Sequence, residues 1–314
     1  MSIIPEEVYE SWVRCAGLGV DPLGKPANKV LEGKELDDLL ARNKELIDVG
    51  QPFMKNLYRF LEGSGFLFSL LDRDVYVLVV LGDPEEEKLI RTAKGFVGAC
   101  WAEPYSGNNV AGSVAFYKKP LQVFGPQQYI RLYHGATGCG APIFGADGEF
   151  IGIVTIFGRY YRANPHTLGI VVSAANAIEN ELKIRRALAE SRVAASYQQT
   201  VISSIQEALV ALDSDGRATL VNEIARRKFD LVNTKVEGRR LRDILPSENA
   251  PFFMLIESNE TITDTEVRIF TRKSSGDYTL TCNPILSPDE QVMGKIIILN
   301  EIQRAKSMVT KMMG

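Results

Sequence analysis

Residues 167–208 decide how this chain is organised, and they read TLGIVVSAANAIENELKIRRALAESRVAASYQQTVISSIQEA. Apolar residues recur there at steps of four, three and four, which is the spacing of a helix face that pairs with another helix. These residues are Val171, Ala175, Ile178 and Leu182. Glu179/Lys183 and Glu181/Arg185 each place an acid four residues before a base, which adds about 0.2–0.5 kcal/mol to a helix. The stretch predicts a long connecting helix with a homodimer seam; the alternative is a helix packed only on its own domain.

Toward the N-terminus, two pairs of β-rich runs are separated by short turns. The runs are residues 66–71 with 75–81, and residues 141–144 with 150–157. The turns, at 72–74 and 145–148, suit antiparallel hairpins. Between them we expect a short helical stretch ending at Tyr117, a strand at 121–124 and a short helix at 127–134. This order predicts an antiparallel sheet with flanking helices, not a βαβ nucleotide fold.

The first 62 residues predict helices. Residues 6–16 are amphipathic, and residues 34–61 repeat apolar residues at steps of three, four and seven. Gly50 and Pro52 interrupt the second pattern, so a kink or break is expected there.

The last third of the chain predicts a second antiparallel unit. Its expected strands are residues 208–212, 219–221, 264–270, 278–285 and 293–299. Helical stretches are expected at 222–229 and 241–244, and a further helix at 302–313.

Composition excludes several classes of protein. The chain has 314 residues, 45% hydrophobic and 24% charged, which suits two globular domains. A net charge of -3 gives no general attraction for nucleic acid or acidic membranes. Neither a membrane span nor a signal peptide is evident, so we expect a cytoplasmic protein. Four scattered cysteines and two histidines do not make a disulfide framework or a metal site.

Several local motifs resemble the sensory region of bacterial sigma-54-dependent activators of the acetoin and dihydroxyacetone regulator type. They are YESWVRCAGLGVD at 9–21, LLARNKEL at 39–46, WAE at 101–103 with NVAG at 109–112, and YHGATGCGAPI at 133–143. EALVALDSDGRATLVNEIARR at 207–227 and GRRLRDIL at 238–245 resemble a PAS domain.

The resemblance implies an α+β fold, in which a GAF domain is joined by a long helix to a PAS domain. It implies an N-terminal helical segment at 1–62, a GAF sensor at 63–166, a connecting and dimerisation helix at 167–200 and a PAS domain at 201–303. Residues 304–314 would begin a linker to an ATPase domain. The chain has no G-x-x-x-x-G-K-[ST] phosphate loop, so we expect only the sensory half of such a regulator. Polymerase and promoter DNA would then be reached only through domains absent from this chain.

The expected effector is a small molecule held in the GAF domain, because aromatic residues there alternate with few polar ones. The predicted ligand-binding residues are Trp101, Tyr105, Asn109, Tyr129, Tyr133, His134, Thr137 and Cys139. The family's pattern is altered at Asn108, Tyr133 and Pro104, so the identity of the ligand is not carried over. In dihydroxyacetone-type relatives the same region is controlled by metabolic enzyme subunits, which makes a protein-interaction sensor the main alternative.

Chemical alternatives carry less weight. His134 and Cys139 lack a clear orienting group for catalysis, and Cys100 with Cys139 could form a redox pair, although free cysteine is usually a buried hydrophobe. Residues 187–314 contain no histidine for an axial haem ligand. The basic residues at 226–228 and 239–242 are more simply a solvated face than a nucleic-acid site. We therefore expect neither an enzyme nor a cofactor.

Overall fold

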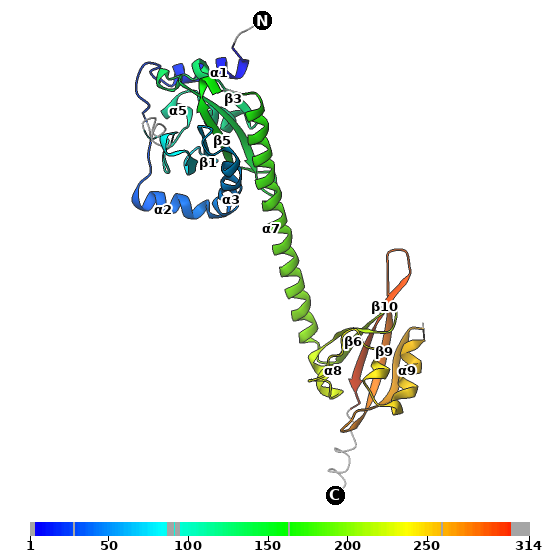
Figure 1. Cartoon of the computed structure of the whole chain (residues 1–314). Coiled ribbons are helices and arrows are strands. Elements are labelled where there is room, and N and C mark those ends of the chain that lie inside the picture. Colours follow the sequence, from blue (N-terminus) through cyan, green and yellow to red (C-terminus); the bar gives the residue numbers. More distant parts are fainter. Residues whose placement is uncertain are drawn as a thin grey trace. The chain divides into compact units, whose positions relative to one another are not determined.

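The computed structural model describes residues 4–27, 29–86, 91, 95–162, 164–258 and 260–302. The chain divides into two compact units, Met1–Glu190 and Ser191–Gly314 (Figure 1). Each unit is built on a five-stranded antiparallel sheet, so the predicted α+β class is confirmed.

The sheet of the first unit has the strand order β2-β1-β5-β4-β3. Its strands are β1 (Phe66–Asp72), β2 (Val77–Gly82), β3 (Leu121–Val123), β4 (Ala136–Phe144) and β5 (Phe150–Arg159). Its helices are α1 (Glu6–Gly17), α2 (Gly33–Arg42), α3 (Lys44–Leu61), α5 (Glu103–Ser106), α6 (Val110–Tyr117) and α7 (His166–Ser204), which continues into the second unit. The described residues also form the 3-10 turns η1 (Gly125–Gln127), η2 (Arg131–Tyr133) and η3 (Tyr160–Arg162). The predicted strands are confirmed, but the short helix expected at 127–134 is two separate 3-10 turns.

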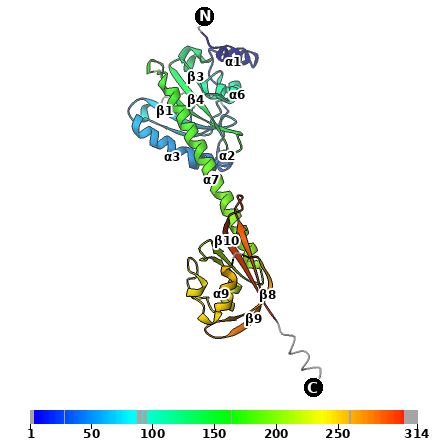
Figure 2. The ribbon, with the colours of Figure 1, turned by 90° about the vertical axis from the view of Figure 1, so that its right-hand side faces the viewer.

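Two apolar layers cover the two faces of this sheet. On one face Phe68, Leu70 and Ile156 pack with side chains of α3 and α7, which lie along the sheet in Figures 1 and 2. On the other face Leu67 and Phe157 pack with α6 and the loops around it. Alternation along each strand divides its side chains between the two layers.

Of the kink or break predicted near Gly50 and Pro52, the break is wrong, and the kink stays a prediction. Helix α3 runs through both residues, and the helical chain is interrupted instead at Asn43, between α2 and α3. A Cβ atom at position 50 would lie 2.9 Å from Leu70 Cδ2, so glycine allows α3 to approach the sheet closely. This packing holds the helix through the proline, which removes one backbone donor.

The four residues predicted as a dimer seam on α7 lie in the core of their own unit, while the dimer itself stays a prediction. Val171 and Ile178 are fully buried, Ala175 and Leu182 are nearly so, and all four belong to the core against their own sheet. These four residues cannot pair with a second copy while they are packed there. For them, the alternative interpretation applies, in which the helix packs on its own domain. Of the two expected ion pairs, Glu181–Arg185 forms at 2.8 Å, whereas Glu179 bonds to the backbone of Phe144 instead.

The second sheet has the order β7-β6-β10-β9-β8, which is again second, first, fifth, fourth and third along the chain. Its elements are β6 (Ala208–Asp213), β7 (Ala218–Val221), α8 (Glu223–Lys228), η4 (Leu241–Asp243), η5 (Ser247–Asn249), α9 (Ala250–Glu257), β8 (Ile262–Phe270), β9 (Ser275–Leu286) and β10 (Val292–Glu301). Helix α9 was not predicted, because its eight residues are too uniformly apolar to show a helical period. The helix expected at 302–313 lies almost wholly outside the described residues.

Candidate functional site

An aromatic cluster lies on the face of the first sheet opposite α7. Trp101 stacks on Tyr133 with ring centroids 5.4 Å apart and planes at 24°, and its ring lies 5.6 Å from that of Phe157. All three side chains are at least nine-tenths buried. Trp101 comes from an irregular segment, Tyr133 from η2 and Phe157 from the end of β5. Together their rings form one aromatic wall.

This wall borders a pocket of about 380 Å³. Leu67, Leu132, Tyr160 and Tyr161 supply further apolar surface, and Gln128, Arg159 and Glu86 are polar or charged residues of its lining. Arg159 Nε donates to Glu86 Oε1 over 3.1 Å, so the two charges neutralise one another. The volume and the apolar lining with few polar groups are those of a small-molecule site.

Two glycines of β4, Gly138 and Gly140, allow α6 and Phe157 to pack closely against that strand. A Cβ at Gly138 would lie 2.7 Å from Val110 Cγ1 and 2.8 Å from Phe157 Cε1, and one at Gly140 would meet Val114. Helix α6 therefore packs directly on the β4 backbone. The alternating residues Thr137 and Cys139 face the opposite layer, toward α7, because side chains alternate along a strand.

The structure therefore separates the predicted ligand-binding residues. Trp101 and Tyr133 line the pocket together. Tyr105 and Cys139 pack in the core on the helix side, Thr137 lies on the same strand face as Cys139, and Tyr129 packs beside α6. His134 Nε2 lies 3.0 Å from the carbonyl oxygen of Gln128 and does not line the pocket.

Asn109 has a structural role. It is fully buried and caps α6 by accepting a hydrogen bond from Gly112 N, while its amide donates to the carbonyls of Trp101 and Gly107. Both amide hydrogens are therefore used within the protein, and Asn109 does not line the pocket. The ligand contact expected from the sequence stays a prediction. The pocket residues missed from the sequence include Gln128, Phe157 and Arg159, whose surroundings carry no local motif.

The cysteines are poorly suited to nucleophilic or redox chemistry. All four are buried free thiols. Burial raises the pKa of Cys139 to about 12 and also raises that of Cys100, so the reactive thiolate is disfavoured at neutral pH. Within the described part of the chain, no cluster of three or more His, Cys, Asp or Glu residues could hold a metal ion. No described helix is both long and apolar enough to cross a membrane.

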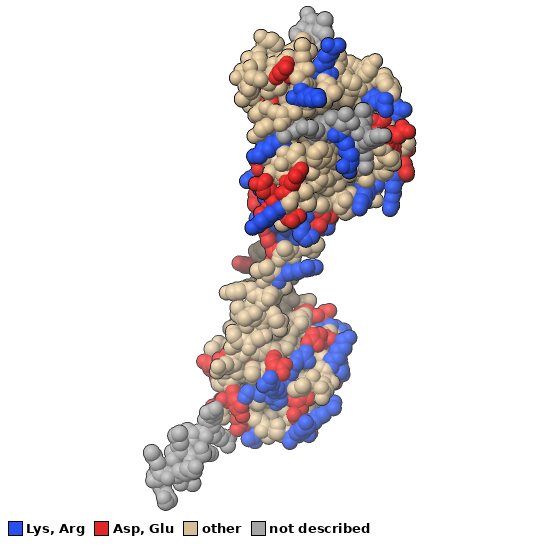
Figure 3. Space-filling view, turned by 90° about the vertical axis from the view of Figure 1, so that its left-hand side faces the viewer, with Lys and Arg blue, Asp and Glu red and all other residues tan. Residues whose placement is uncertain are grey.

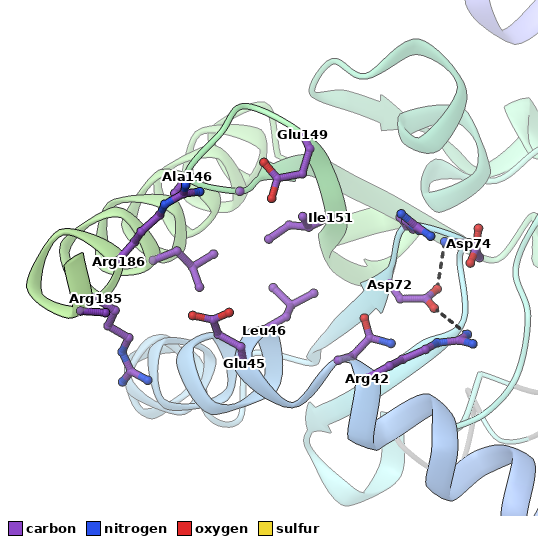
Figure 4. Close-up of a pocket in the computed structure, with 15 residues that line it drawn as sticks. Arg42, Glu45, Leu46, Asp72, Asp74, Ala146, Glu149, Ile151, Arg185 and Arg186 are labelled. Atoms are coloured by element: carbon purple, nitrogen blue, oxygen red, sulfur yellow. Dashed lines mark hydrogen bonds and ion pairs between the residues drawn. The ribbon is translucent and has the colours of Figure 1, made fainter. Parts of the chain in front are cut away.

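A second, larger groove of about 770 Å³ lies where α7 leaves the sheet (Figure 4). Arg185 and Arg186 line it from α7, and buried Asp72 lies across from them beside Arg42. Asp72 Oδ2 lies 3.4 Å from Arg42 Nη2, Arg185 pairs with Glu181, and Arg186 pairs with Asp147 and Glu190. These pairs compensate much of its charge.

In the second unit, four of the six basic residues at 226–228 and 239–242 form ion pairs. Arg226 pairs with Glu237, Arg227 with Glu223, Lys228 with Glu301 and Arg242 with Glu257. Basic and acidic side chains are interspersed on the face shown in Figure 3. The arrangement is a solvated surface, as expected from the sequence.

Comparisons with known proteins agree with this architecture. Residues 202–307 match the PAS fold family. The crystal structure of the Escherichia coli DhaR(N)–DhaL complex has a chain that superposes with a TM-score of 0.83 at 18% identity, covering 94% of this chain and 99% of that one. The shared fold therefore extends over both units.

Several curated relatives are named as regulators of transcription. A signal-transduction and transcriptional-control protein of Clostridium beijerinckii is 27% identical over 98% of this chain and 48% of its own length. The acetoin dehydrogenase operon activator AcoR of Bacillus subtilis is 28% identical over 64% of this chain and 33% of its own. The PTS-dependent dihydroxyacetone kinase operon regulatory protein of Escherichia coli is 20% identical over 98% and 47%.

The chain thus spans half or less of the length of these relatives. Sequence and fold together relate it to the N-terminal sensory region of the bacterial regulators of acetoin and dihydroxyacetone operons.

Proposed function

We propose that this chain is the ligand-sensing region of a sigma-54-dependent transcriptional regulator, and that its effector is a small metabolite bound beside Trp101 and Tyr133. The observation that carries the proposal is the pocket of about 380 Å³ with a buried aromatic wall. In this proposal residues 63–166 act as a GAF sensor on which residues 1–62 pack, residues 167–200 connect, and residues 201–303 are the PAS relay. The protein acts in the cytoplasm without catalysing a reaction.

The route by which binding would be transmitted follows β4 and β5. At the pocket end of these strands lie Ala136 and Phe157. At the other end, Glu179 of α7 bonds to Phe144, and Arg186 of α7 pairs with Asp147 in the turn between the strands. An effector that binds one arrangement of these strands more tightly than another shifts the attachment of α7.

Homodimerisation is proposed through a different face of α7 from the one first expected. Ile184 and Leu188 are 55% and 54% exposed, and Ala195 and Ile202 continue their stripe at steps of seven. This is the spacing of a coiled-coil seam. Paired helices would carry the signal to ATPase and DNA-binding domains outside this chain, which would contact polymerase and promoter DNA.

A second candidate is a sensor controlled by a protein partner. Leu132, Tyr160 and Tyr161 are half or more exposed at the mouth of the pocket, and exposed apolar surface of this kind marks interaction sites. The structurally similar DhaR(N) chain was crystallised in complex with DhaL. In this version a partner's side chain would occupy the pocket.

A thermal-shift screen of small alcohols, ketones, acids and aromatics tests the proposal. Each hit is repeated with Ala136→Phe, which places a large side chain in the pocket. We expect the variant to abolish the shift while circular dichroism shows it folded. Hits that bind the variant as well as the parent would place the effector elsewhere, and a complete lack of hits would favour the protein partner.

A further inference from the structure

Gln128 presents a buried hydrogen-bond acceptor at the pocket. Its side-chain nitrogen donates to the backbone oxygens of Tyr133 at 2.8 Å and Ala136 at 2.7 Å. Since only the NH₂ group can donate to two carbonyls, this pair of bonds fixes the orientation of the amide. Among the described residues no donor reaches Oε1, although Gln128 is 3% exposed and lines the pocket.

Trp101, which also lines the pocket, carries a hydrogen-bond donor, the indole N–H, to complement the Gln128 acceptor. The side chain is 5% exposed, and no described residue accepts a hydrogen bond from its indole N–H. By contrast, the indole N–H of Trp12 donates to the backbone oxygen of Gln127 over 2.8 Å. A buried polar atom without a partner is costly, and a ligand that supplies one recovers that free energy.

The charge of the pocket limits the ligand further. Among the described residues, Arg159 and Glu86 are the charged ones that line the pocket, and they are already paired with each other. A charged ligand would have to break that pair or enter without a counter-ion, and burying an unpaired charge is strongly unfavourable. The ring pair of Trp101 and Tyr133 offers a flat surface for a second ring.

We propose that the pocket takes an uncharged aromatic compound carrying a hydroxyl group. The hydroxyl oxygen accepts from the Trp101 N–H, the hydroxyl hydrogen goes to Gln128 Oε1, and the ring packs on the aromatic wall. This inference rests on the proposed function and names the chemical class of its effector.

Three uncharged probes separate the contributions by calorimetry. Phenol has both the donor and the acceptor, anisole keeps only the acceptor, and toluene has neither; benzoate tests an anionic compound of similar size. We expect phenol to bind more tightly than anisole and anisole more tightly than toluene, each step by about two- to tenfold, since a neutral hydrogen bond adds roughly 0.5–1.5 kcal/mol. Benzoate should bind more weakly than phenol.

Two matched variants test whether the indole N–H of Trp101 donates the hydrogen bond to the probe. Trp101→Phe keeps a stacking ring and removes the N–H, so anisole and toluene should bind it equally. Trp12→Phe removes the other indole of a chain with two tryptophans and should keep the parent order. In that variant Trp101 is the sole tryptophan, so its fluorescence reports binding at the pocket directly.

Equal binding of phenol and toluene to the parent, or tighter binding of benzoate, would overturn the chemical class even if Trp101→Phe did not fold. If another metabolite binds and Ala136→Phe blocks it, the proposed function survives that failure. If Ala136→Phe alters the binding of no compound, both proposals fail.

Discussion

Glu179 of α7 accepts a hydrogen bond from the backbone N–H of Phe144, with Oε1 2.9 Å from the nitrogen. The pairing of β4 with β5 shifts register between Ile143 and Phe144, and the Glu179 carboxylate bonds to the backbone at this irregularity. The long helix and the sheet are thus joined by a specific polar contact as well as by their apolar core. The same strand, β4, lines the pocket at its other end through Ala136.

Removing this contact should destabilise the first unit. Glu179→Ala leaves the Phe144 N–H without its partner, at a cost of about 1–3 kcal/mol, whereas Glu179→Gln keeps an acceptor oxygen and should lose less. Both tryptophans lie in the first unit, so their fluorescence during urea denaturation reports that unit. Equal stability of Glu179→Ala and the parent would show that the contact contributes nothing.

The close approach of α6 to β4 should make Gly138 sensitive to the smallest side chain. Gly138→Ala would bring a Cβ within 2.7 Å of Val110 Cγ1, and such overpacking costs about 1–3 kcal/mol. Gly135→Ala is the matched control, because a Cβ there meets nothing within 4 Å. Denaturation should show a clear loss for the first variant and little loss for the second; the reverse order would contradict the packing.

The exposed stripe of α7 predicts a dimer that a charge can dissociate. Leu188→Asp should yield a monomer in analytical ultracentrifugation, because it places a carboxylate in the proposed seam. Val193→Asp is the control: it is 71% exposed and lies on another side of the helix. A parent protein that is already monomeric, or a control that dissociates equally well, would argue against this face.

Ile178→Asp distinguishes the two faces of the same helix. Ile178 is fully buried against its own sheet, so a buried carboxylate should unfold the first unit and not merely separate subunits. Circular dichroism and tryptophan fluorescence would report this unfolding. A folded monomeric Ile178→Asp variant would restore the original seam.

The buried thiols should react slowly in the folded protein. Burial raises the pKa of Cys15 to about 11 and that of Cys139 to about 12, so both stay protonated at pH 8. A thiol reagent should modify the cysteines slowly at that pH and all four rapidly after denaturation. Rapid modification of Cys139 in the native state would revive the redox alternative.

The same shifts predict a loss of stability in alkali. A thiol whose folded pKa lies above its unfolded value contributes stability below the unfolded value and loses it as pH rises through the folded one. The unfolding free energy should therefore fall between about pH 9 and 12, by up to roughly 1.4 kcal/mol per pH unit for Cys139. Cys139→Ala should weaken this dependence, measured by denaturation across the range.

The sequence by itself determined most of the secondary structure. Alternation and turn residues predicted the hairpins, and the apolar steps from Val171 to Leu182 predicted both the helix and its buried face. These features depend on neighbours a few residues away, so local patterns are enough to specify them.

Only the tertiary structure decided what each face meets. An apolar stripe buries equally well against its own sheet or a second copy, so the partner of Ile178 could not be read from its spacing. Likewise, the alternation of side chains places Thr137 and Cys139 on one face of β4 and Gly138 on the other. The sequence of the strand does not specify which of these faces borders the pocket. The polar atoms of that pocket depend on the orientation of Gln128, which is set by two carbonyls five and eight residues away along an irregular path. Local sequence cannot specify that path, because the packing of the whole unit determines it.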